Sequence, residues 1–321
     1  MTDSTAGTEA RQTPVHRPAR RRSAPPVRSL WSRITEYRAA YVFILPSIIL
    51  LALFMVVPLV HSIVMSFHNW NGITAPEYIG MANYERLFSE RRFGQAIQNN
   101  LIFLVLFTSC TLVLGFLSAV AISRRMRFWR FYRFAFFVPY VLVTAVIAVL
   151  WGQIYEPSHG ILNTALRAVG LDSLTQLWLG NHRITMYSIV AIAIWQISGF
   201  TMLLYLAAME GIDQEIHDAA TIDGVNAWQR CIYIIAPMVK QITFVLIMLQ
   251  IIASLKTFDL IWVLTKGGPF YASEVMGTYL YRAAFEQQQF GYASAVALVM
   301  TVIVMAVTIV YLALTNLPNK K

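Results

Sequence analysis

The chain has 321 residues, of which 57% are hydrophobic and only 13% are charged. Soluble domains carry roughly 45–50% apolar and about 25% charged residues, so this shortage of charge excludes an ordinary water-soluble fold. The net charge of +9 would suggest a nucleic-acid partner in a soluble protein, but here a membrane accounts for it better, and we expect no nucleic-acid partner.

The first 38 residues are rich in Arg, Pro, Ser and Thr and include the run Arg20-Arg21-Arg22. This composition predicts a disordered basic cytoplasmic tail over residues 1–38. A cleaved signal peptide is not expected, because the apolar stretch that follows is much longer than a signal core of about 7–15 residues.

Six apolar stretches follow, each long enough for a membrane-spanning helix, which needs about 20 residues. They cover residues 39–67, 99–123, 131–153, 184–209, 239–264 and 292–315. Prolines fall inside the first and third stretches, and membrane helices tolerate them when neighbours satisfy the freed carbonyls. We therefore predict an all-α membrane protein with six transmembrane helices, whose transmembrane domain covers residues 39–315.

The distribution of Lys and Arg predicts the orientation. Most of them fall in the N-terminal tail, in the 124–133 loop and at the C-terminus, which places both termini, including the tail 316–321, in the cytoplasm. The Arg124 to Arg133 cluster is interpreted as a topology anchor, with contact to lipid headgroups as a second role. The expected location is the bacterial cytoplasmic (inner) membrane.

The segment 210–237 is unusual because it is long and acidic at its start. Helical spacing groups five apolar residues into a stripe, and Gly224 and Asn226 are suited to end one helix and cap the next. The stripe consists of Ile212, Ile216, Ala219, Ala220 and Ile222. A helical hairpin lying on the bilayer is one interpretation, but such helices are usually rich in Lys and Arg. Docking into a groove of a partner protein is the favoured alternative.

The same segment carries a recognisable motif. Asp218-Ala219-Ala220 is followed by Gly224, then by Ile234 and Pro237. This spacing resembles the EAA loop of binding-protein-dependent ABC importer permeases, with Asp218 in place of Glu and Ala236 in place of Leu. The stretches 56–70, 159–163, 258–269 and 290–297 also resemble the first permease of carbohydrate-type importers, such as the maltose and glycerol-3-phosphate systems.

The resemblance implies a type I ABC importer permease fold, with a core at about residues 95–315. It implies a second permease subunit, two ATPase subunits and an extracytoplasmic solute-binding protein as partners, besides membrane lipid. Coupling to the ATPase is then expected at the motif residues Asp218, Ala219, Ala220, Gly224, Ile234 and Pro237. The chain has no G-x-x-x-x-G-K-[ST] loop, so we expect no enzyme activity and no cofactor in this chain, with ATP and Mg on the partner subunits.

The transported solute is expected to be a sugar or sugar-like molecule. Gln250, Ser254 and Thr257 share one helix face, and the resemblance implies sugar contact at these positions, although polar stripes also serve helix packing. Trp195 and Phe200 offer aromatic faces for a sugar ring, or belong to the core.

Two charges are predicted inside the fifth span. Lys256 and Asp259 are three residues apart, so they either form an ion pair or reach the outer interface separately. A stand-alone secondary transporter would need such a pair at mid-membrane. Import of a glycerophosphodiester or another polar metabolite by the same machine is a further alternative. A membrane enzyme lacks support, because no HExxH or G-x-S-x-G motif is present. Two lone cysteines, Cys110 and Cys231, make no metal site.

Overall fold

The computed structural model describes residues 38–123 and 127–316. The predicted N-terminal tail up to residue 37, Arg124, Arg125 and the C-terminal segment 317–321 lie outside the described residues. The described chain divides into two units, one ending at Val57 and the other starting at Pro58.

The first unit is helical. It contains α2 (Arg38–Leu51), which holds Pro46 in its interior, and the π-helix η1 (Ala52–Val56). The apolar segment Val42–Met65 has a mean hydropathy of 2.8, and none of it is buried. A helix that is apolar all round is suited to lipid or to a membrane-embedded partner.

The second unit begins with short elements. After α3 (Val57–Met65), the strands β1 (His68–Asn69) and β2 (Glu77–Tyr78) pair antiparallel, with His68 opposite Tyr78. Helix α4 (Ala82–Ser89) follows and leads directly into the long α5.

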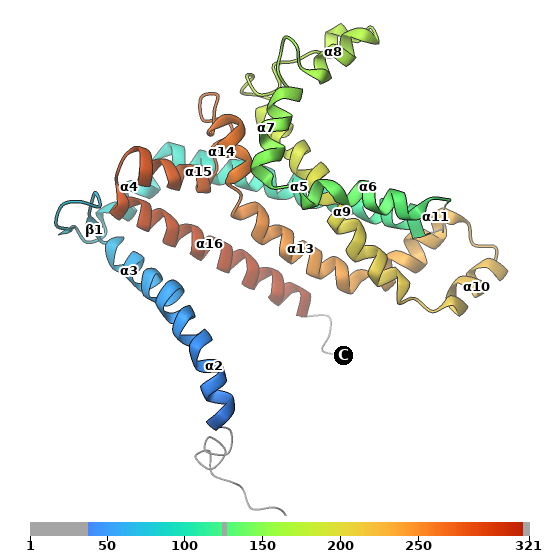
Figure 1. Cartoon of the computed structure of the whole chain (residues 1–321), viewed down its shortest axis with the longest axis horizontal. Helices are drawn as coiled ribbons and strands as arrows, with labels where there is room; N and C mark the ends of the chain where they lie inside the picture. The colour runs from blue at the N-terminus through green and yellow to red at the C-terminus, as the bar shows by residue number, and fades with distance from the viewer. Residues whose placement is uncertain (1–37, 124–126, 317–321) are drawn as a thin grey trace, which may run out of the picture. The chain divides into compact units, whose positions relative to one another are not determined.

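The membrane spans of the second unit are continuous helices and bent pairs (Figure 1). The continuous ones are α5 (Arg91–Ser123), α9 (Thr185–Glu210) and α16 (Phe290–Asn316). Helices α6 (Trp129–Val141) and α7 (Thr144–Ile154) meet at 99°, and the segment Ala227–Met238 meets α13 (Lys240–Leu255) at 71°. In the described part of the chain, four helices can cross a membrane, or up to six if each bent pair counts as one span. The predicted all-α membrane fold is confirmed, with a two-stranded ribbon added.

Shorter elements connect these spans. They are α8 (Ile161–Ala168), the 3-10 turn η2 (Asp172–Leu174), α10 (Gln214–Ile222), α11 (Ala227–Gln229), the π-helix η3 (Arg230–Ile235), α12 (Ala236–Met238), α14 (Asp259–Thr265), α15 (Met276–Tyr281) and the π-helix η4 (Arg282–Glu286). Helices α10 and α11 lie at one end of α9 and α13, while α4 and α15 lie at the other end of the unit (Figure 1).

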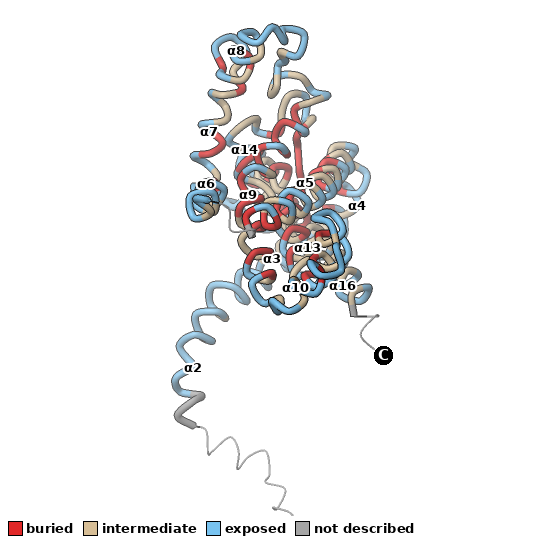
Figure 2. The backbone as a smooth tube through the Cα atoms, turned by 90° about the vertical axis from the view of Figure 1, so that its right-hand side faces the viewer, coloured by how far each residue is buried: buried red, intermediate tan, exposed pale blue. Residues whose placement is uncertain are grey.

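The core of the second unit is built around α5 and α9. Both helices carry buried residues in a cluster with α7 and α14, including Phe107 and Ile189, and in a cluster with η3 and α13, including Met202 and Leu246. Figure 2 shows this burial along α5, α9 and α13, whereas the outer helices are mostly exposed. The exposed outer faces are apolar, as expected for surfaces that meet lipid or another membrane subunit.

Two predicted spans are broken rather than continuous. The third breaks at Leu142 and Val143, whose backbones are extended, shortly after Pro139 has removed a helix donor. The fifth, predicted over 239–264, ends at Leu255, and a short turn separates it from α14. Lys256 and Asp259 therefore do not lie within a continuous span, and a break that exposes both avoids the cost of charge inside an apolar helix.

Candidate functional site

The segment 210–237 folds as the predicted helical hairpin. Helix α10 ends at Ile222, and Gly224 adopts a φ of +70°, which strains any residue with a Cβ. The amide of Val225 donates to the carbonyl of Ala220 at 3.0 Å, and that of Gly224 to Thr221 at 3.2 Å. These are the two bonds of a Schellman motif, so the predicted role of Gly224 as a helix stop is confirmed.

The second half of the hairpin starts at Asn226, as predicted. Its side chain accepts a hydrogen bond from the Gln229 amide at 2.8 Å, and the Gln229 side chain accepts one from the Asn226 amide at 3.0 Å. This reciprocal pair is a capping box. Pro237 lies in the short α12, directly before the bend into α13, and Ile234 is half-buried in η3.

The predicted apolar stripe of α10 is split between two faces. Ala220 is buried and Ile212 packs on the core, but Ala219 is exposed and Ile222 is 86% exposed. The reason is spacing: Ile212, Ile216 and Ala220 recur every four residues on the inner side, whereas Ala219 and Ile222 are three apart on the outer side. Asp218 is also exposed.

Two arginines hold the hairpin in place: Arg230, for which no role was predicted, and Arg133, which was predicted only as part of the topology anchor. Arg230 donates through Nη2 to the His217 carbonyl and to Thr221 Oγ1 at 2.9 Å, which ties η3 to α10. Arg133 of α6 donates to Glu210 at the end of α9 at 2.6 Å. Both contacts join segments distant in sequence, so local spacing gives no signal for them.

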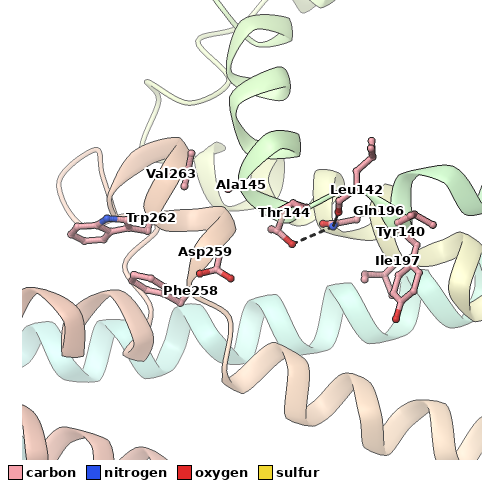
Figure 3. Close-up of a pocket in the computed structure, with 12 residues that line it drawn as sticks. Tyr140, Leu142, Thr144, Ala145, Gln196, Ile197, Phe258, Asp259, Trp262 and Val263 are labelled. Carbon is pink, nitrogen blue, oxygen red and sulfur yellow. Dashed lines mark hydrogen bonds between the residues drawn. The ribbon is translucent and has the colours of Figure 1, made fainter.

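A cleft of about 880 Å³ opens between the bend that joins α6 to α7 and the turn that separates α13 from α14 (Figure 3). Tyr140, Leu142 and Thr144 line it from the bend between α6 and α7, Gln196 from α9, and Phe258, Asp259 and Trp262 from the bend before and within α14. Gln196 Nε2 donates to Thr144 Oγ1 at 3.3 Å and to the Leu142 carbonyl at 3.4 Å. The side chain thereby satisfies a carbonyl that the helix break leaves free.

The chemistry of the cleft is polar and aromatic. Asp259 is exposed and is the one acidic or basic residue among those that line it. No ion pair joins it to Lys256 within the described residues, so the alternative in which these two charges pair is wrong. Tyr140 stacks on Phe200 at 4.5 Å between ring centroids, so Phe200 supports the cleft wall without lining it.

The other predicted solute contacts lie elsewhere. Gln250 is buried between α5, α9 and α13, where its amide bonds Thr111 at 2.8 Å and Thr201 at 3.2 Å. Ser254 is also buried, and its hydroxyl donates to the Gln250 carbonyl at 2.6 Å. These contacts favour the packing interpretation for both residues.

The remaining two candidates lie outside the buried contact that Gln250 makes with Thr111 and Thr201. Thr257 is half-buried in the turn after α13. Trp195 is 41% exposed and lies edge-on to Trp151 with 5.5 Å between centroids. The five predicted residues are therefore not brought together into one site by this chain.

A polar network braces the end of the unit that carries α4 and α15. Glu274 is buried, and its carboxylate lies 3.4 Å from both Arg92 and Arg282. Burial raises the pKa of Glu274 above its ordinary value, although the two arginines oppose the shift. This carboxylate therefore resists ionisation more than an exposed one does.

Glu90 accepts hydrogen bonds from the hydroxyls of Tyr279 at 2.5 Å and Tyr292 at 2.6 Å. Burial alone would raise the pKa of Glu90, but these hydrogen bonds, with Arg86 and Arg92 nearby, bring it below its ordinary 4.5. Among the described residues no group of three or more His, Cys, Asp or Glu could hold a metal ion.

Comparison with known proteins identifies the family of this chain. Residues 112–321 match the family described as "Binding-protein-dependent transport system inner membrane component". A probable ABC transporter permease protein of Pyrococcus horikoshii is 35% identical over 271 residues, which is 84% of this chain and 93% of the relative. The diacetylchitobiose uptake system permease protein of Streptomyces coelicolor is 31% identical, covering 94% of this chain and 88% of the relative.

Among solved structures, a bacterial alginate ABC transporter in complex with an alginate pentasaccharide-bound periplasmic protein matches with a TM-score of 0.80. The match covers 91% of this chain and 99% of the other at 23% sequence identity, which shows a shared fold. This chain belongs to the family of inner membrane components of binding-protein-dependent transport systems.

Proposed function

We propose that the chain is one of two permease subunits in an ATP-driven importer of a sugar or sugar-like solute. ATP is hydrolysed on two separate ATPase subunits, and an extracytoplasmic binding protein delivers the solute. Family membership supports the permease role, and the name of the Streptomyces relative supports a carbohydrate cargo. The chain itself has no loop to cradle ATP phosphates, which supports a separate ATPase that holds ATP and Mg.

The cleft at the two bends is the proposed solute path. Trp262 and Tyr140 offer aromatic faces to the C–H faces of a sugar ring, while Gln196 and Asp259 offer partners for its hydroxyls. A glycerophosphodiester is the second candidate cargo. It carries a negative charge and would meet Asp259 without a compensating cation among the lining residues, so the cleft favours a neutral solute.

The hairpin is the proposed contact for an ATPase subunit. The observation that carries this role is the difference in exposure between neighbouring residues of α10. Ala220 is buried and packs the helix against the bundle, whereas Asp218 and Ala219 are exposed. A preset hairpin with an exposed acidic and small-residue face suits docking into a partner groove. α9 runs unbroken from Thr185 to Glu210, so it links the hairpin to Gln196 in the cleft.

Cross-linking in the assembled importer tests the contact. Ala219→Cys should form a cross-link with an ATPase subunit, whereas the matched variant Ala220→Cys should not, because its side chain is buried. Equal cross-linking from both positions, or none from Ala219, would contradict the proposed docking face.

Two substitutions of Gly224 test the turn. Gly224→Asn should keep uptake, since Asn tolerates the left-handed conformation, and Gly224→Val should abolish uptake while membrane insertion continues. Normal uptake by the valine variant would refute a coupling role for this turn.

The cargo is tested by solute-stimulated ATPase activity of the reconstituted importer. Neutral oligosaccharides should stimulate it more than glycerophosphodiesters, and Trp262→Ala should lower the stimulation by the active sugar. Stimulation by glycerophosphodiesters alone would replace the sugar with the second candidate and leave the permease role intact.

A further inference from the structure

A second cavity lies between the hairpin and the ends of the membrane helices. Its volume is about 1080 Å³. It is lined by the ends of α5, α6 and α9, by α10, and by α11 and η3. No residue of the proposed solute path contributes to it, so it is a separate site.

Two arginines in the wall have hydrogen-bonding capacity to spare. Arg133 uses Nη2 for Glu210, and Arg230 uses Nη2 for the His217 carbonyl and Thr221. Within residues 38–123 and 127–316, neither Nη1 has a hydrogen-bond partner, and both buried Nε atoms are also without one. A guanidinium carries N–H donors arranged to fit a phosphate, so each arginine can still donate to an anion through Nη1 beside its protein contact.

The rest of the wall is amphipathic. Val120 and Ile122 come from α5, and Leu206 and Met209 from α9, so the ends of two spans supply an apolar surface. Trp129 lies under the Arg133 guanidinium, 4.5 Å from its ring centroid, and tryptophan favours the boundary between lipid and water. Glu210 is the single carboxylate in the lining and is already paired with Arg133, so the two arginines leave the cavity positive.

We propose that this cavity binds an anionic membrane phospholipid. Its phosphodiester lies between Arg133 and Arg230, and an acyl chain lies along the apolar ends of α5 and α9. Basic pockets at the water-facing ends of membrane helices are suited to such headgroups. A soluble phosphate would use the arginines but leave the apolar wall uncovered, so a lipid fits more of the lining. Because the wall includes both hairpin helices and span ends, the lipid braces the hairpin.

The test measures bound phosphatidylglycerol in the purified, assembled importer. Complexes are placed in nanodiscs of phosphatidylcholine with added phosphatidylglycerol, and retained lipid is counted by native mass spectrometry. The double variant Arg133→Gln/Arg230→Gln should bind phosphatidylglycerol at least about tenfold more weakly, since it loses two charge-assisted partners. Arg91→Gln/Arg183→Gln is the matched control: it also removes two positive charges, from exposed side chains outside the cavity and outside the Arg124–Arg133 cluster.

A second variant keeps both arginines. Ala227→Trp fills part of the cavity from its wall and should also reduce the amount of retained phosphatidylglycerol. This variant tests the proposal if the double variant fails to assemble. Wild-type retention by the double variant and by Ala227→Trp would overturn the proposal. Displacement of the lipid by excess inorganic phosphate would also overturn it and assign the site to a soluble anion. Neither result bears on ATPase docking at Ala219, which the cross-linking experiment tests separately.

Discussion

At Gly199, α9 lies very close to the backbone of α6. A Cβ built on it would lie 1.8 Å from the Phe136 carbonyl oxygen and 2.5 Å from its carbon, both of which are backbone atoms. Small residues allow such close helix crossings in membranes. We predict that Gly199→Ala forces the two helices apart.

The size of the effect follows from these distances. A Cβ contact of even 3.0 Å requires the α6 backbone to move by at least about 1.2 Å, and a backbone carbonyl cannot rotate out of the way as a side chain can. Overpacking of this kind costs about 1–3 kcal/mol, or more where nothing can yield. At about 2–4 °C per kcal/mol, the unfolding temperature should fall by about 2–12 °C.

The same displacement reaches the cleft. Gln196 lies one turn before Gly199, and its hydrogen bonds to Thr144 and to the Leu142 carbonyl are already 3.3 and 3.4 Å long. A further separation of more than about 1 Å would break both bonds and move Tyr140 away from Phe200. Solute uptake should therefore fall together with stability.

The assay is thermal unfolding of the assembled importer in detergent, followed by uptake in proteoliposomes. Gly94→Ala in α5 is the matched control, because a Cβ added at Gly94 would meet no atom within 4 Å and alanine favours a helix by about 0.5–1 kcal/mol. Its unfolding temperature should stay the same or rise. A Gly199→Ala importer with wild-type unfolding temperature and uptake would refute the reasoning.

Three further predictions concern single side chains. Gln250→Leu should lower the unfolding temperature, because it breaks the buried hydrogen bonds to α5 and α9, whereas the KM for solute should stay unchanged. A large rise in KM would instead support the predicted sugar contact. The pKa of Glu90 is lowered in the folded state, so its ionised form stabilises the fold above pH 4.5, and this stabilisation is lost as the pH falls through the folded pKa. In thermal unfolding measured over a pH series, Glu90→Gln should therefore lose less stability at acidic pH than the wild type. Asn226→Ala removes a helix cap worth about 0.5–2 kcal/mol, so hydrogen exchange of the amides in 227–235 should accelerate, and unchanged exchange would contradict the capping role.

The hairpin could be predicted from the sequence because its determinants are local. Gly224 and Asn226 act through hydrogen bonds to residues three to five positions away, and those distances are fixed by helix geometry. Which face of α10 is buried could not be predicted from the sequence. Ala219 and Ala220 look equivalent as small apolar residues, and which one is buried depends on how Glu210 and Arg230 anchor the two ends of the hairpin.

The cleft could not be predicted, because its position depends on two helix breaks that become adjacent only in three dimensions. Pro139 indicated the first break, but the second has no proline, and its segment reads as one apolar run apart from Lys256 and Asp259. For the same reason the sequence predicted Gln250 as a solute contact and gave no signal for Gln196. Helical periodicity places Gln250, Ser254 and Thr257 on one face, but it does not identify what that face meets.

The packed position of Gln250 also explains why α9 is suited to transmit movement. Gln250 bonds Thr201 of α9 and Thr111 of α5, so both central helices are tied to α13 in the middle of the bundle. Gln196 and Glu210 are 14 residues apart on α9, which at about 1.5 Å per residue separates them by roughly 21 Å. We propose that a displacement of the Glu210 end is carried along this unbroken helix to Gln196, where it would change the width of the cleft between Gln196 and α14.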